Sequence, residues 1–168
     1  MQRLFLSAVS LAIAMGLAPV TNAADFSVKL LPPWDGKTVP AGQHCPLQGG
    51  KGKTPPMQVS GLPKGTSWIL VEFNDKSYPP LSSNGGHGKI GFPVSGKSAT
   101  LPAVPGMTNR LPLGIRVVAR ARSSGEYASK GYLPPCSGGR GNRYSADVKA
   151  MSKDDKVLGK KTVSLGRY

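Results

Sequence analysis

Short apolar or alternating segments, separated by turns, run along the chain. The strongest covers residues 68–73, where Trp-Ile-Leu-Val-Glu-Phe is almost continuously apolar, as expected for a β-strand with both faces covered. Residues 113–121 and 143–151 alternate apolar and polar side chains, which predicts strands with one solvated face. No stretch keeps the period of an amphipathic helix over several turns. The pattern therefore predicts a mainly β protein.

Weaker apolar segments predict further strands, which we place over residues 25–31, 54–59, 89–94 and 157–165. Loops are expected over residues 45–56 and 96–113. The chain of 168 residues contains 22 Gly and 16 Pro, and this punctuation suits many short strands. We predict two antiparallel sheets in a sandwich, or a distorted barrel, with few short helices.

The N-terminal segment has the features of an export signal. Arg3 precedes a mostly apolar run over residues 4–17, and Thr-Asn-Ala at residues 21–23 offers a small-x-small cleavage site. The run is too short to span a bilayer comfortably, so a membrane anchor is the weaker alternative. We expect cleavage near Ala23, one domain over residues 24–168, and a periplasmic or secreted location.

Two cysteines, Cys45 and Cys136, follow the expected cleavage site. An exported chain with only two cysteines usually oxidises them to one bond, so we expect a Cys45–Cys136 disulfide. Two cysteines without a CxxC spacing make a poor metal-ligand set, and we expect no metal site.

The formal net charge is +14, which favours anionic partners such as phosphate groups, lipid head groups, polysaccharide or nucleic acid. Because the basic residues are scattered, solubility or nonspecific adhesion explains the charge equally well. No aromatic and basic interleaving typical of RNA-recognition strands is present, so we expect no specific nucleic-acid binding. Membrane contact is expected to be peripheral at most.

Catalytic motifs are also missing from the sequence. There is no GxSxG, HExxH or P-loop pattern, and the only histidines are His44 and His87. Few general acid–base pairs can therefore be built. We expect no enzymatic activity and no cofactor.

Residues 132–144 combine prolines, glycines, arginines and Cys136 in one short stretch. Glycines permit positive φ, so consecutive backbone N–H groups can form an anion-binding concavity, to which Arg140 and Arg143 would add donors. The alternative is a disulfide-anchored turn between two strands. From the stretch alone, both interpretations stay open.

Three segments together resemble a known family. Thr-Pro-Pro-Met-Gln-Val-Ser-Gly-Leu-Pro-Lys-Gly-Thr at residues 54–66 is followed by Asp-Lys-Ser-Tyr-Pro at 75–79, then His87, and finally Gly-Tyr-Leu-Pro-Pro-Cys through Asn-Arg-Tyr at 131–144. In this order they are similar to the S-P-P-x-x-W-x-G-x-P-x-G-T, D-P-D-A-P, H-W and G-P-x…H-R-Y motifs of the phosphatidylethanolamine-binding proteins. The resemblance is to their bacterial Raf-kinase-inhibitor-like branch, and it covers most of residues 24–168.

The chain departs from the family motifs at three positions. Ser77 replaces the second aspartate of the D-P-D-A-P box, and Gly88 replaces the tryptophan of H-W. Asn142 replaces the histidine of H-R-Y, while Arg143 and Tyr144 are retained. An amide at residue 142 still donates a hydrogen bond, although it cannot carry a proton charge.

The resemblance implies a sandwich of a smaller and a larger sheet with one or two short helices, here without a C-terminal helix because residues 153–158 are compressed. It implies non-catalytic binding of a phosphate-bearing ligand or head group in a pocket formed by residues 75–79, 87 and 132–144. The implied ligand-binding residues are Asp75, Tyr78, Pro79, His87, Pro135, Ser137, Gly138, Asn142 and Tyr144.

Within this pocket Asp75 would fix the tautomer of His87 or accept a proton-bearing amine. The glycine N–H groups, Asn142 and Arg140 would receive the phosphate. Without the resemblance, an alternative interpretation stays open: Asp75 caps a turn, and His87 is an ordinary loop histidine without a binding role. A second function that the resemblance implies is inhibition of a protease or another envelope or host protein.

Overall fold

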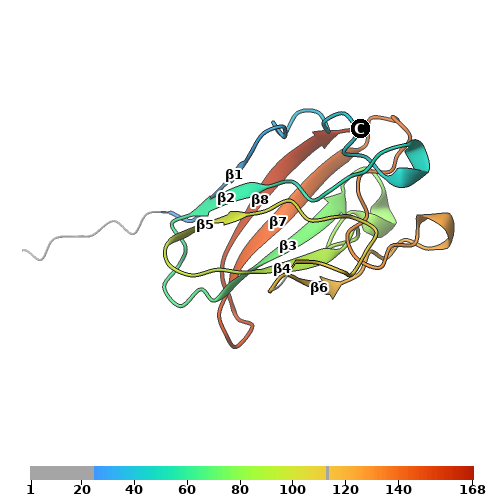
Figure 1. Ribbon diagram of the computed structural model, residues 1–168. Coiled ribbons are helices and arrows are strands. Elements are labelled where there is room, and N and C mark those ends of the chain that lie inside the picture. Colours follow the sequence, from blue (N-terminus) through green and yellow to red (C-terminus); the bar gives the residue numbers. More distant parts are fainter. Residues whose placement is uncertain (1–24, 113) are drawn as a thin grey trace, which may run out of the picture.

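The computed structural model describes residues 25–112 and 114–168; the expected export signal over residues 1–23 lies outside them. Two antiparallel sheets pack face to face (Figure 1). The smaller has the order β1 (Ser27–Leu30), β2 (Met57–Ser60), β5 (Ser98–Leu101). The larger has the order β6 (Arg116–Ala119), β4 (Lys89–Pro93), β3 (Trp68–Asp75), β7 (Arg143–Met151), β8 (Val157–Arg167). The predicted mainly β sandwich is confirmed.

The central strand β3 is the apolar run that the sequence singled out, and every residue in it is buried. Ile69 and Val71 belong to the main core between the sheets. Trp68 and Leu70 point to the other face and pack there with Met151 of β7. Burial on both faces explains why this strand lacks the apolar–polar alternation of its neighbours.

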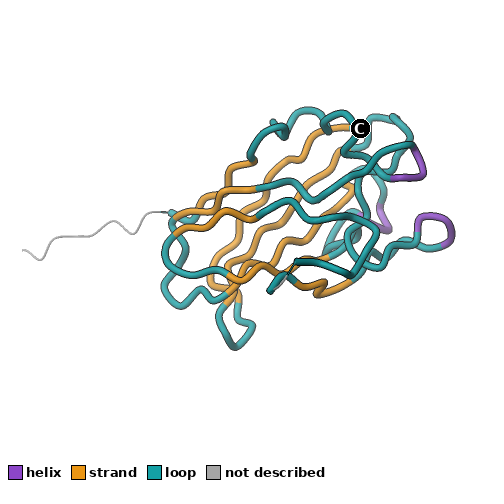
Figure 2. The backbone as a smooth tube through the Cα atoms, viewed as in Figure 1, coloured by secondary structure: helices purple, strands orange, loops and turns teal. Residues whose placement is uncertain are grey.

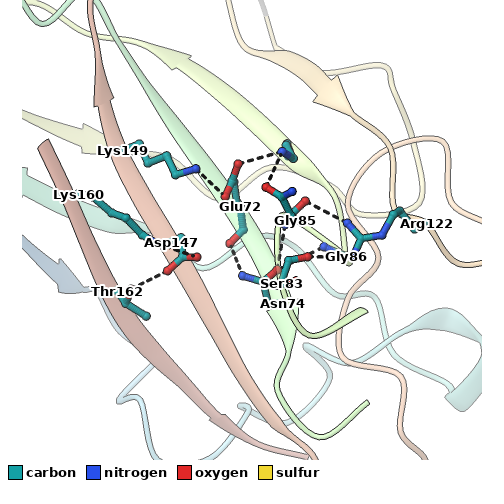
Figure 3. Close-up of polar contacts among 12 residues, drawn as sticks. Glu72, Asn74, Ser83, Gly85, Gly86, Arg122, Asp147, Lys149, Lys160 and Thr162 are labelled. Atoms are coloured by element: carbon teal, nitrogen blue, oxygen red, sulfur yellow. Dashed lines mark hydrogen bonds and ion pairs between the residues drawn. The ribbon is translucent and has the colours of Figure 1, made fainter. Parts of the chain in front are cut away.

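Glu72 is the charged exception within β3. Its carboxylate is buried and lies 2.9 Å from the Nζ atoms of both Lys89 in β4 and Lys149 in β7 (Figure 3). Burial by itself raises the pKa of Glu72, but the two ammonium groups outweigh it and hold the pKa below its usual 4.5. The three central strands are thus joined by one ionic contact on the outer face of the larger sheet.

Two predicted loops contain more structure than expected. The region 96–113 includes strand β5, which pairs with β2 along its whole length. The region 45–56 has exposed residues, as a surface loop should, but buried ones lie between them: Thr54 is fully buried, its N–H donates to the carbonyl of Val104, and its Oγ1 accepts from the N–H of Val104. Their glycine, lysine and proline content is typical of surface loops, but backbone groups of both regions form hydrogen bonds with segments distant in sequence.

Among the described residues, helical structure is limited to three single turns of 3₁₀ helix, which gather at one end of the sandwich in Figure 2. They are η1 (Pro46–Gln48), η2 (Pro79–Leu81) and η3 (Gly125–Tyr127). A tight turn joins β7 directly to β8, where the N–H of Ser152 donates to the carbonyl of Lys156. In residues 25–112 and 114–168, no helix is long and apolar enough to cross a membrane.

Candidate functional site

The end of β3 and the starts of β4 and β7 meet around a cavity of about 620 Å³. Asp75, the last residue of β3, is the cross-strand neighbour of Tyr144 in β7. His87 is held beside the same strand, because its N–H donates to the carbonyl of Phe73. Sheet pairing therefore brings Asp75, His87 and Tyr144 together from three distant parts of the sequence.

Asp75 is buried and already has two partners. Its Oδ1 accepts a hydrogen bond from the N–H of Ser77, and its Oδ2 accepts one from Nδ2 of Asn142 at 2.7 Å. Ser77 in turn accepts from the N–H of Arg143. Two of the three departing residues thus orient the aspartate that remains, Ser77 through its backbone N–H and Asn142 through its side chain.

His87 is 3% exposed, and its Nδ1 lies 2.8 Å from the carbonyl oxygen of Leu133. Because a carbonyl only accepts, Nδ1 carries the proton and Nε2 presents a lone pair. Burial lowers the pKa of His87, while the Leu133 carbonyl and Asp75 oppose that effect. Asp75 was expected to fix the tautomer; that role belongs to Leu133.

The Nε2 atom of His87 opens into the cavity. It forms no hydrogen bond with the described residues, and no buried side-chain nitrogen or oxygen among them lacks a partner, so Nε2 is not sealed from solvent. His87 lines the cavity and its ring meets Tyr144 edge-on, with centroids 5.4 Å apart. A ligand in this position would meet a hydrogen-bond acceptor.

Tyr144 contributes a phenol to the same floor. Its Oη accepts a hydrogen bond from the N–H of Cys136, so the phenolic proton is free to donate elsewhere. Burial raises the pKa of Tyr144 to about 12, and the nearby Asp75 charge acts in the same direction. The phenol therefore remains a neutral donor at physiological pH.

The loop before β7 forms one wall and is fixed from behind. The expected Cys45–Cys136 disulfide is present, with Cα atoms 5.2 Å apart. Gly138 has a φ of +66°, and its N–H donates to Oε1 of Gln48 in η1. Ser137 donates its hydroxyl to the carbonyl of Tyr168. Of the two interpretations of this stretch, the disulfide-anchored turn is correct, and the same turn also lines the cavity.

Most of the residues predicted to bind ligand face this cavity. Six line it: Asp75, Tyr78, His87, Ser137, Asn142 and Tyr144. Three do not: Pro79, Pro135 and Gly138. Pro79 begins η2. Pro135 is buried, and its carbonyl accepts a hydrogen bond from the N–H of Cys45. The N–H of Gly138 donates to Oε1 of Gln48. These three residues shape the walls rather than face the cavity.

The residues around Arg122 complete the cavity and were missed. Arg122 lines it and donates from its guanidinium to the carbonyls of Pro80, Ser83 and Asn84. Figure 3 shows the contact with Ser83. These bonds fasten the η2 loop to the segment after β6. No short motif marks Arg122, because its partners are backbone carbonyls far away in sequence. The other lining residues outside the predicted segments are Pro80, Leu81, Ser123, Ser124 and Tyr127, while Leu133 and Cys136 lie within the predicted segment 132–144.

Gly88 explains one departure from the family motifs. Its φ is +111°, and a Cβ atom there would lie 2.8 Å from the carbonyl oxygen of Gly131. A tryptophan at this position has no room, because the chain at Gly131 and Tyr132 passes directly beside the backbone. The close approach is what lets the carbonyl of His87 accept from the N–H of Leu133.

The site has the chemistry of a binding pocket with a polar floor. A carboxylate, an imidazole lone pair and a phenol lie at its base, and Arg140 lies at its rim. In the part of the chain that the structure describes, no three His, Cys, Asp or Glu side chains cluster as metal ligands. The volume falls within the range of small-molecule sites, about 300–1,000 Å³.

Solved structures share this architecture. Escherichia coli YbcL, described as a new member of the mammalian phosphatidylethanolamine-binding protein (PEBP) family, has 18% identity and a TM-score of 0.57, with 86% of this chain and 98% of that chain covered. The chain has the PEBP fold. The PEBP homolog CT736 from Chlamydia trachomatis gives 17% identity and a TM-score of 0.51, covering 85% of this chain and 96% of that one.

The PEBP fold thus confirms, at the level of architecture, the resemblance drawn from short motifs. No protein-family model matches the chain, and no curated protein is similar to it. Both PEBP-fold structures are covered along nearly their whole length, so the likeness extends over the whole fold of each.

Proposed function

We propose that the protein is a non-catalytic binding protein of the periplasm, or a secreted one, that holds a small phosphate-bearing ligand or head group in this cavity. The observation that supports it is the convergence of Asp75, His87 and Asn142, from three separate segments, on one cavity of about 620 Å³. Pockets that recognise small molecules combine such convergent polar groups with apolar walls, here Leu81 and Leu133.

The polarity of the cavity favours one orientation of the ligand. Asp75 and Nε2 of His87 are acceptors, so the floor suits a donor such as an ammonium group. Arg140 is exposed at the rim and has no carboxylate within salt-bridge distance in the described residues, so the phosphate belongs there. A phosphoethanolamine-like molecule carries both groups.

Isothermal titration calorimetry with three small molecules tests the proposal. Phosphoethanolamine is expected to bind more tightly than ethyl phosphate, which lacks the amine, and than ethanolamine, which lacks the phosphate. Asp75→Asn keeps the size of the side chain and removes its charge. It should weaken phosphoethanolamine binding by about tenfold, since a charge-assisted hydrogen bond contributes roughly 1.5–3 kcal/mol.

Matched controls separate this pocket from general cation–anion attraction. Lys64→Gln, in the turn before β3 and away from the cavity, should leave binding unchanged, whereas Arg140→Gln should weaken it. Absence of binding at millimolar phosphoethanolamine, or equal binding by wild type and Asp75→Asn, would refute the proposal.

A further inference from the structure

We propose that the end of the sandwich around the cavity mouth is a surface that docks onto an anionic lipid bilayer. The proposal rests on the proposed function: if the pocket binds a lipid head group, its opening must face the membrane surface. Three segments surround that opening: residues 76–80, 122–130 and 137–143. We call them together the rim.

The rim is strongly cationic. It carries five basic residues and a single carboxylate, and all six residues are exposed. The basic residues are Lys76, Arg122, Lys130, Arg140 and Arg143, and the acidic one is Glu126. Arg122 and Arg140 line the cavity, and the other three basic residues belong to the segments that flank it. The net charge of these segments favours an anionic surface over a second copy of the same chain.

The rim also exposes aromatic side chains that a soluble surface does not require. Tyr78 is 51% exposed at one side of the cavity, and Tyr127 is 39% exposed in η3 on another. Tyrosine combines an apolar ring with a polar hydroxyl, the combination that is enriched where proteins meet lipid head groups. The turn η1, which carries the 48% exposed Leu47, lies at the same end of the molecule as the other 3₁₀ turns (Figure 2).

The backbone holds these side chains on a rigid base. Arg122 fixes the η2 loop through three carbonyls, and the Cys45–Cys136 disulfide ties the third segment to η1. The two tyrosines and Arg140 are exposed beside these fixed turns, whereas Lys76 and Arg122 donate to backbone carbonyls. Docking would place the cavity mouth against the head groups, with Asp75 and His87 at its base.

Co-sedimentation with vesicles tests the proposal. The chain over residues 24–168 is expected to bind phosphatidylcholine vesicles that contain phosphatidylglycerol and to ignore vesicles of phosphatidylcholine alone. Raising the salt concentration should weaken but not abolish binding, because the tyrosines add a contact that salt does not screen. Both lipids carry a phosphate, so Asp75→Asn is measured beside wild type to separate docking from occupancy of the cavity.

Paired variants locate the surface. Lys130→Gln with Arg143→Gln should lower vesicle affinity about tenfold, and so should Tyr78→Ser with Tyr127→Ser. Lys64→Gln with Lys153→Gln removes the same charge from turns at the opposite end of the sandwich and should retain wild-type affinity. Equal losses in the rim and control variants would show nonspecific adsorption and overturn the proposal, as would absence of binding to anionic vesicles.

The docking proposal and the proposed function can be refuted independently of each other. Asp75→Asn should keep vesicle binding and weaken phosphoethanolamine binding about tenfold. If phosphoethanolamine binds to the free protein but anionic vesicles do not, the pocket stands and the docking surface is refuted. If the rim variants lose vesicle binding although no soluble ligand binds, docking stands and the proposed function fails.

Discussion

At the scale of single residues, His87 shows how burial sets chemistry. The Leu133 carbonyl fixes its tautomer, and burial keeps the imidazole neutral by lowering its pKa. The sequence pointed to His87 and Asp75 through the family resemblance, but it could not reveal their partners. Leu133 and Asn142 act through contacts across 46 and 67 residues of sequence, which no local pattern records.

The pH dependence of stability tests the environment of His87. Its folded pKa lies below the ordinary 6.5, so the unfolded chain binds a proton more readily. Stability should be fully present above pH 6.5 and decline as the pH falls below it. Melting temperatures from pH 8 to 5 should show this decline in wild type and a flatter profile in His87→Gln. Parallel profiles would contradict the assignment.

Gly88 gives a steric test at the same scale. Gly88→Ala places a Cβ against the Gly131 carbonyl and strains a φ of +111°, so we expect a loss of about 2–4 kcal/mol in unfolding free energy. Gly139→Ala is the control: its φ is also positive, +73°, but nothing lies within 4 Å of the added atom. It should cost about 1–2 kcal/mol in urea denaturation. Equal losses would show that the close approach is unimportant.

At the scale of elements, the larger sheet depends on β3. The continuous apolar run of β3 and the alternation of β7 could be predicted because their burial imposes a pattern on neighbouring residues. Strand β5 could not, because its sequence, Ser-Ala-Thr-Leu, is short, carries one buried side chain and lies among glycines and prolines. Its pairing with β2 is decided by tertiary contact.

The ionic contact of Glu72 links β3 to its two neighbours and can be removed with one substitution. Glu72→Gln leaves the ammonium groups of Lys89 and Lys149, which are 23% and 19% exposed, without a counter-charge. We expect a loss of about 1–3 kcal/mol at neutral pH by urea denaturation, discounted for the partial exposure of the lysines. Because the folded pKa of Glu72 lies below 4.5, this difference should persist at neutral pH and vanish in acid.

A more exposed ion pair on the same sheet serves as the control. Lys160 is 50% exposed and lies 3.4 Å from Asp147 (Figure 3). Lys160→Gln should change the unfolding free energy by about 0.5 kcal/mol or less. A loss as large as that of Glu72→Gln would show that burial does not distinguish the two contacts.

At the scale of the whole molecule, one disulfide ties the N-terminal half to the wall of the cavity. It closes a loop of 91 residues, which the chain-entropy argument values at about 4–5 kcal/mol. Cys45→Ser with Cys136→Ser should lower the unfolding free energy by about 2–5 kcal/mol, measured by urea denaturation. Wild type with its disulfide reduced should have the same unfolding free energy as the double variant. A smaller loss in either protein would mean that the hydrogen bonds of Gln48 are sufficient to hold the loop.

The central claim is that Asp75, His87 and Asn142 form one ligand-binding cavity, and nuclear magnetic resonance tests it most directly. Phosphoethanolamine is titrated into isotope-labelled protein, and backbone amide shifts are followed residue by residue. The account predicts saturable shifts confined to the amides around Asp75, His87 and residues 136–144, and their loss in Asp75→Asn. Shifts spread over the lysines of the opposite end, or none at millimolar ligand, would contradict it.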